Sequence, residues 1–194
     1  GIEPYKGRWA LPGGFMRMDE SAEKGALREL KEETGIEGAY IKQFGTFTNP
    51  DRDPRERVIT IAYYALIKLQ EVRGDDDAAD ARWFSLDEVP SLAFDHDMIL
   101  RTALMELRKQ IHFEPVGFEL LPEKFTIKEL QNLYEAILDV NFDRRNFYNK
   151  MKRFEILEQL EERVMPTPKK EAFLFRFNID KYNELKQKGF RLEF

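Results

Sequence analysis

The segment 21–35 constrains the fold most, because its pattern predicts one amphipathic helix with two chemically different faces. Ser21 suits the N-cap, and Gly35 suits the left-handed residue that ends a helix. At about 100° per residue, one stripe carries Leu27, Leu30 and Thr34. A separate face carries three carboxylates, those of Glu29, Glu32 and Glu33. The chain should therefore pack one face of this helix on a core and present the other to solvent or a ligand.

Carboxylates spaced three and four residues apart repel one another, at a cost of roughly a few tenths of a kcal/mol per pair in an isolated helix. A bound divalent cation would reverse that cost. Oxygen ligands without thiolate or imidazole favour Mg²⁺ or Mn²⁺, whose remaining coordination positions can hold water and phosphate. The alternative is an ordinary solvated acidic face. That alternative explains neither the neighbouring glycines nor Arg28.

A wider pattern contains this helix: Gly14, five residues, Glu20, seven residues, then Arg28-Glu29-Leu30-Lys31-Glu32-Glu33-Thr34-Gly35-Ile36. It resembles the Nudix box, G-x5-E-x7-R-E-U-x-E-E-x-G-U with U aliphatic, at every fixed position. The preceding Trp9-Ala10-Leu11-Pro12-Gly13 resembles the usual lead-in to that box. The resemblance implies metal-assisted attack of water on the pyrophosphate of a nucleoside diphosphate linked to a further moiety, X.

The same resemblance implies roles for individual residues. The metal ligands would be the side chains of Glu29, Glu32 and Glu33 and the backbone carbonyl of Gly13, with Mg²⁺ or Mn²⁺ bound between them. Glu20 would pair with Arg28 and fix the helix. The predicted catalytic residues are therefore Glu20, Arg28, Glu29, Glu32 and Glu33.

Two strands are expected after the helix, over residues 39–48 and 58–70. Residues 49–57, with two prolines and several charges, should form the loop between them. Within it, Arg52-Asp53-Pro54-Arg55, followed by an Ala-Tyr strand, resembles the ADP-ribose-type branch of the Nudix family. Three arginines are therefore candidates for binding substrate phosphate, namely Arg52, Arg55 and Arg57. The alternative is a solvated loop.

The acidic run of residues 75–80 is typical of a solvated turn. The family resemblance also makes Asp77 or Asp80 a candidate for an additional metal ligand or base. A short strand is expected over residues 81–84, followed by a helical turn capped by Ser85.

A helix from Met98 to about Gln110 should complete this part of the chain, which resembles the end of an ADP-ribose-type Nudix domain near His112. The preceding His96 is interpreted as a capping or packing residue rather than a metal ligand.

Residues 125–154 predict two helices separated by a short break. Thr126 and Glu129 form a capping box at the start of the first helix, and Asp143 caps the second. The apolar face of the first helix carries Ile127, Leu130, Tyr134 and Ile137, and that of the second carries Phe147, Met151 and Phe154. Because the second helix is basic on its other side, the pair outlines a helix-turn-helix.

Residues 163–177 predict a strand, a turn rich in proline and lysine, and a strand with alternating phenylalanines. A hairpin in this place would complete a winged helix, whereas the alternative is a small packing domain with surface lysines. Segments 118–122, 133–137 and 143–147 resemble the C-terminal domain of Nudix-related transcriptional regulators. The predicted DNA-binding residues are Arg144, Arg145, Asn149, Lys152, Arg153, Lys169 and Lys170.

Composition limits the remaining possibilities. Residues 1–112 carry 16 Lys+Arg against 21 Asp+Glu, and residues 113–194 carry 15 against 15, so any DNA binding needs a local basic surface. Cysteine is absent, which favours a cytoplasmic chain without disulfides. We find no apolar run long enough to cross a membrane and no visible signal peptide.

The expected class is α+β, with a Nudix α/β/α sandwich built on a mixed sheet over residues 1–114 and a winged helix-turn-helix domain over residues 115–194. Nudix proteins have a strand before a segment like residues 1–7, so we expect N-terminal strand material to be missing.

Three functions remain open. The first is a DNA-binding regulator, commonly dimeric in this family, whose Nudix domain senses ADP-ribose or a related nucleotide sugar, with or without hydrolysis. The second is a Mg²⁺-dependent ADP-ribose pyrophosphatase with an accessory dimerisation domain. The third is an adaptor, against which the intact carboxylate set argues.

Overall fold

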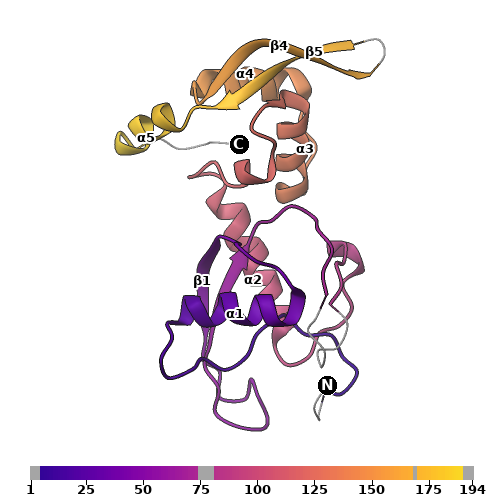
Figure 1. The fold of residues 1–194 in the computed structure, drawn as a ribbon, viewed down its shortest axis with the longest axis vertical. Coiled ribbons are helices and arrows are strands. Elements are labelled where there is room, and N and C mark those ends of the chain that lie inside the picture. The colour runs from indigo at the N-terminus through magenta and orange to yellow at the C-terminus, as the bar shows by residue number, and fades with distance from the viewer. Residues whose placement is uncertain (1–4, 74–80, 168–169, 190–194) are drawn as a thin grey trace. The chain divides into compact units, whose positions relative to one another are not determined.

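The computed structural model describes residues 5–73, 81–167 and 170–189. The chain divides into two compact units, Gly1–Glu106 and Leu107–Phe194 (Figure 1). None of the helices in these described ranges is long and apolar enough to cross a membrane.

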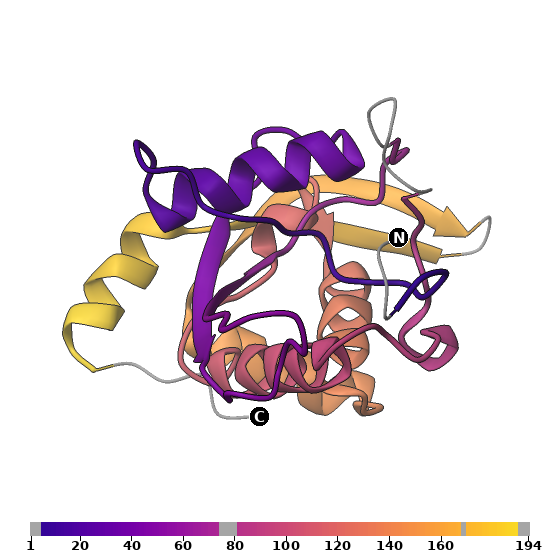
Figure 2. The same ribbon diagram turned by 90° about the horizontal axis from the view of Figure 1, so that it is seen from below.

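The first unit contains helix α1 (Ala22–Thr34), strands β1 (Ile41–Phe47) and β2 (Thr60–Ala65), and most of helix α2 (His96–Gln110). The two strands form an antiparallel pair, with a bulge in β1 between Gln43 and Gly45. Helix α1 lies next to β1 (Figures 1 and 2). An isolated parallel bridge joins Trp9 to Leu92 and brings the segment before α1 beside the segment before α2.

Helix α1 has the predicted ends. The Ser21 hydroxyl accepts a hydrogen bond from the backbone N–H of Lys24 at 3.3 Å. Gly35 is left-handed, with φ of 73°, and a Cβ there would lie 3.0 Å from the carbonyl oxygen of Arg73. Both the backbone angle and the close approach therefore require glycine at this position.

The first unit differs from expectation in two places. Residues 81–84 form no strand, because side-chain contacts rather than backbone hydrogen bonds to a neighbouring strand hold them. Trp83 Nε1 donates to the carbonyl oxygen of Gln70 at 2.7 Å, and the Phe84 ring packs edge-on against Trp9. The second strand, expected over residues 58–70, spans only Thr60–Ala65. The acidic candidates Asp77 and Asp80 lie outside the described residues.

The second unit contains helices α3 (Ile127–Leu138), α4 (Arg144–Phe154) and α5 (Ile179–Gln187), with strands β3 (Phe125–Thr126), β4 (Leu157–Thr167) and β5 (Lys170–Phe177). The strand order is β3-β5-β4, and both pairings are antiparallel. Two helices followed by a hairpin confirm the predicted winged helix, while β3 and α5 were not predicted. Its core consists of Ile111, Phe125, Leu130, Tyr134, Phe147, Met151 and Phe175.

Local interactions set where α3 and α4 begin and end. Thr126 and Glu129 form the predicted capping box, and the Asp143 carboxylate accepts from the backbone N–H of Asn146 at 2.8 Å. The two helices end at the left-handed residues Asp139 and Glu155, with φ of 58° and 56°. The short break between the helices is thereby fixed, and α4 is held with Phe147 and Met151 against the core.

Candidate functional site

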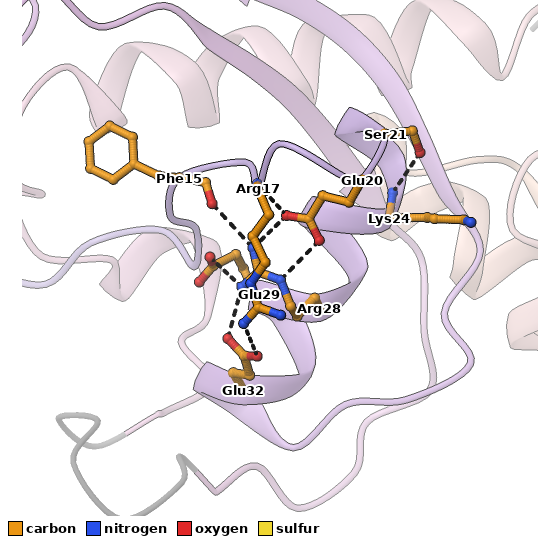
Figure 3. A network of polar contacts seen from close by, with 8 residues as sticks. All are labelled: Phe15, Arg17, Glu20, Ser21, Lys24, Arg28, Glu29 and Glu32. Carbon is orange, nitrogen blue, oxygen red and sulfur yellow. Dashed lines mark hydrogen bonds and ion pairs between the residues drawn. The ribbon is translucent and has the colours of Figure 1, made fainter.

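The carboxylate face of α1 is organised around the guanidinium of Arg28 (Figure 3). Its Nε and Nη2 donate to the two carboxylate oxygens of Glu20, at 3.1 and 2.7 Å, which is the expected pair. Its Nη1 donates to Glu29 at 2.7 Å and to Glu32 at 2.9 Å. Nη2 also donates to the carbonyl oxygen of Phe15 at 3.2 Å. One arginine therefore ties the preceding loop to the helix and offsets part of the negative charge of its acidic face.

The environment of Arg28 and Glu20 favours the ionised form of both side chains. The side chains of Arg28 and Glu20 are only 17% and 12% exposed. Hydrogen bonds from Arg28 and from the backbone N–H of Arg17 lower the pKa of Glu20 to about 2. The bonds to Glu20 and Glu29 in turn raise the pKa of Arg28. Both groups therefore stay ionised across the physiological pH range.

Glu33 lies apart from this network. One of its carboxylate oxygens accepts a hydrogen bond from the backbone N–H of Gly13 at 3.0 Å. Burial raises the pKa of Glu33, and the negative charges of Glu29 and Glu32 act in the same direction. Its ionised form is therefore less favourable than in water, and a cation bound nearby would stabilise that form.

Gly14 approaches the carboxylate face from the loop before α1. A Cβ built on Gly14 would lie 2.4 Å from Oε1 of Glu29, a separation that atoms do not adopt. Any side chain at this position would push the carboxylate aside. The backbone of Gly13 therefore contacts the carboxylate of Glu33, and the backbone of Gly14 lies against that of Glu29.

The carboxylates fit a divalent cation by their chemistry, because Glu29, Glu32 and Glu33 supply oxygen ligands from adjacent turns of one helix. Their side chains are not gathered as a metal site: within the described ranges, no group of three acidic or histidine side chains is placed to hold a metal. The cause is visible in the contacts, since Arg28 Nη1 takes one oxygen from each of Glu29 and Glu32. Arg28 Nη1 therefore competes with a cation for one oxygen of each of these two carboxylates, while Nε and Nη2 bind Glu20.

The structure separates the three arginines of the loop between β1 and β2. Arg52 is buried; its Nε and Nη2 donate to Asp95 at 3.0 and 2.7 Å, and Nη1 donates to Thr60 at 2.6 Å. Its guanidinium is thus bound to Asp95 and Thr60, which makes Arg52 the least accessible of the three candidates for phosphate binding. The partner Asp95 was missed, although it opens the polar run 95–97 at the start of α2.

Arg55 and Arg57 remain exposed and are the available cations of this loop. Arg55 forms two hydrogen bonds with the carboxylate of Asp53, at 3.0 and 2.7 Å, and lies over the ring of Phe94 at 4.9 Å. Arg57 donates to the carbonyl oxygen of Thr48 at 2.8 Å. Both side chains are oriented by neighbours yet keep donors that face solvent.

A second candidate site is the outer face of α4. The predicted residues on it are exposed: Arg144, Arg145, Asn149, Lys152 and Arg153. In the parts of the chain that the structure describes, the four cations of this set form no ion pair with a carboxylate. Lys169 lies outside the described residues, and Lys170 begins β5, its side chain not being among those described.

The stem of the hairpin, formed by β4 and β5, differs from α4 because its arginines are paired with carboxylates. Within the hairpin of β4 and β5, Arg163 pairs with Glu171 at 2.7 Å and Arg176 with Glu158 at 2.8 Å. Glu162 of β4 also pairs with Lys124, next to β3, at 2.6 Å. These two arginines of the stem are therefore already neutralised by the protein, whereas the four exposed cations of α4 named above have no carboxylate partner among the described residues.

A box-bearing α/β unit followed by a winged helix defines a class of proteins that combine a nucleotide-handling domain with a DNA-binding module. Comparison with known families supports both halves: the NUDIX domain matches residues 2–106, and the NrtR DNA-binding winged helix domain matches residues 117–177. The chain belongs to the NrtR family of Nudix proteins.

Three relatives illustrate the similarity. The ADPR responsive transcriptional repressor NtrR of Acinetobacter baylyi is 33% identical over 185 residues, which cover 93% of this chain and 74% of the relative. The crystal structure of Shewanella oneidensis NrtR complexed with a 27mer DNA is 29% identical, with a TM-score of 0.76, over 98% of this chain and 86% of that one. An ADP-ribose pyrophosphatase of Methanocaldococcus jannaschii is 43% identical over 98 residues, 50% of this chain and 58% of the enzyme.

Proposed function

We propose that the chain is a DNA-binding transcriptional regulator whose Nudix domain senses ADP-ribose or a related nucleotide sugar. The observation that carries this proposal is the outer face of α4. Its exposed cations have no carboxylate partners among the described residues, and they lie on the second helix of a helix-turn-helix. The similarity to an ADPR responsive repressor and to a regulator in complex with DNA supports both parts of the proposal.

The basic helix suits the major groove of duplex DNA. Arginine and lysine read guanine there and asparagine reads adenine, and each good bidentate contact contributes about 1–3 kcal/mol of discrimination. Arg145, Asn149 and Lys152 are the residues we assign to this readout. Arg144, Arg153 and the hairpin lysines Lys169 and Lys170 would contact phosphates. A homodimer would place two such helices on a palindrome with half-sites separated by whole helical turns.

The Nudix domain would bind the effector next to α1. We assign Glu29, Glu32 and Glu33, with the carbonyl of Gly13, to a divalent cation, Mg²⁺ or Mn²⁺. When bound, that cation would neutralise phosphate charge and activate a water molecule. Arg28 holds Glu20 and thereby the loop before the helix, and Arg55 and Arg57 can donate to phosphate oxygens.

We place the domain boundary at residue 114, with the Nudix domain over residues 1–114 and the DNA-binding domain over residues 115–194. That boundary lies in the stretch 107–116, which neither family description covers. A regulator of this kind acts on the chromosome, and we therefore expect it in the cytoplasm.

A second candidate function is an ADP-ribose pyrophosphatase whose second domain serves dimerisation. The complete Nudix box favours it, as does the similarity of the first half of the chain to such an enzyme. The two candidates are compatible if the regulator slowly hydrolyses its own effector.

The decisive experiment measures binding of the full-length protein to the promoter of its own operon and to a scrambled duplex by fluorescence anisotropy, with and without ADP-ribose. We expect selective binding that ADP-ribose shifts, because a ligand that distinguishes two arrangements of a dimer must be linked to DNA affinity. If no duplex is bound selectively while ADP-ribose is cleaved in Mg²⁺, the enzyme is the better description.

A further inference from the structure

The segment before α1 is fastened at two points, one in the segment before α2 and one at His96, the first residue of α2. The carbonyl oxygen of Trp9 accepts from the backbone N–H of Ala93 at 2.8 Å, beside the parallel bridge between Trp9 and Leu92. Two residues later, the backbone N–H of Leu11 donates to Nδ1 of His96 at 2.9 Å. Leu11 and His96 are both partly buried, and 85 positions separate them in the sequence.

The imidazole of His96 serves here as an acceptor. A neutral imidazole that accepts at Nδ1 carries its proton on Nε2, whereas a protonated ring has no acceptor at all. Burial lowers the pKa of His96, which favours the neutral form. The ring also packs near Phe94, at 5.6 Å between centroids, so its orientation is fixed.

The same segment meets the carboxylate face of α1 only two residues further on. The backbone N–H of Gly13 donates to Glu33 at 3.0 Å, and Gly14 is in close contact with the carboxylate of Glu29. Pro12 has no N–H. The backbone donors of residues 11–13 are therefore just two: one is given to His96 and the next to Glu33.

We propose that His96 is a positioning residue for the box carboxylates, which it serves by fixing Leu11 so that Gly13 and Gly14 meet Glu33 and Glu29. The Trp9–Ala93 bond holds the segment further upstream and does not fix the peptide planes of residues 11–13. This inference rests on the proposed cation site of α1. Its first readout, however, is the backbone of Gly13 and does not need a ligand.

The test uses the full-length protein with three substitutions. His96→Asn keeps an oxygen acceptor where Nδ1 stands, and His96→Leu keeps the approximate size without an acceptor. His112→Leu removes the other histidine of the chain, which lies in the second unit, and is the matched control. Thermal unfolding shows whether each variant is folded.

Two measurements follow on each variant. With ¹⁵N-glycine labelling, the spectrum is limited to glycine amides, and those of Gly13 and Gly14 should move in His96→Leu and stay near their original positions in His96→Asn. Titration with Mn²⁺ alone should show affinity about 10-fold weaker in His96→Leu, the lower end of the range for residues that support metal ligands. His96→Asn and His112→Leu should stay within about 2-fold of the original protein, a change of less than half of one kcal/mol.

The outcomes separate this inference from the proposed function. Glycine signals that are unchanged in a folded His96→Leu protein, or altered equally by the asparagine and leucine variants, would overturn the positioning role. Failure of the original protein to bind Mn²⁺ would count against the cation site, while the Gly13 signal would still decide the role of His96.

Discussion

Removing two unpaired cations from α4 should change how DNA affinity depends on salt. Arg144→Ala combined with Arg153→Ala deletes two exposed side chains of α4 that we assign to phosphate contacts and that make no ion pair in the described parts of the chain. Positive charge is favourable near the C-terminal end of the helix, where Arg153 lies, and unfavourable near its N-terminal end, where Arg144 lies, so the two effects on the fold, about 0.3–1 kcal/mol each, should largely offset each other. The loss of DNA affinity should be larger and should depend on salt.

The size of that dependence follows from counterion release. Each phosphate contact on B-DNA contributes about 0.9 to the slope of log affinity against log salt, so two lost contacts lower the slope by about 1.8. Between 50 and 200 mM salt, the affinity of the original protein should therefore fall about 12-fold more than that of the variant. Near 1 M salt the two proteins should bind almost equally.

The assay is anisotropy with one operator duplex at several salt concentrations. The matched control is Arg163→Ala combined with Arg176→Ala, which removes the same charge from the stem of the hairpin, where both cations are already paired. The control should leave the slope unchanged. An equal flattening by both double variants would mean that net charge, rather than the position of unpaired cations, governs binding, and the reasoning would be refuted.

Four further predictions test the first unit. Glu33→Gln should nearly abolish any Mg²⁺-dependent cleavage of ADP-ribose, measured as release of AMP, by removing a metal ligand, and an active variant would exclude that role. Arg55→Ala should weaken ADP-ribose binding by about 1.5–3 kcal/mol in calorimetry if its guanidinium contacts phosphate. Arg52→Ala should instead lower the free energy of unfolding by about 3 kcal/mol or more, because Asp95 loses its buried partner. Hydrogen bonds lower the pKa of Glu20 from 4.5 to about 2, so its contribution to stability should be complete above pH 4.5 and disappear as the pH falls towards 2. The free energy of unfolding in urea should therefore vary less with pH over that interval in Glu20→Gln than in the original protein.

Local rules were enough to predict the helices. Ser21, Gly35, Thr126 and Asp143 mark helix ends through hydrogen bonds to nearby backbone groups, and each was found in the predicted role. For residues 81–84 the same local rules predicted a strand, which is absent. Their sequence pattern is that of a strand, but contacts with residues distant in the sequence hold them in place.

In the candidate effector site, too, local patterns predicted contacts between residues that are near in the sequence and missed those between distant ones. Spacing along one helix identified the three carboxylates, whereas the Glu20–Arg28 pair was expected from the resemblance to the Nudix box and is present in the structure. The burial of Arg52 depends on Asp95, which is 43 positions away, and a single sequence gives no measure of that contact. Arg52 and Arg55 look alike in the sequence, and only the fold separates their environments.

The ion pairs on the hairpin stem matter for competition among DNA sequences. Exposed pairs of this kind contribute little to folding, typically no more than about 1 kcal/mol each. Each one nevertheless removes a cation that any duplex could otherwise attract, whatever its sequence. A chromosome offers about a million or more competing sites, so a protein with a strongly basic stem would spend most of its time away from its operator. By neutralising Arg163 with Glu171 and Arg176 with Glu158, the chain leaves the choice of site to α4, the helix to which we assign base readout.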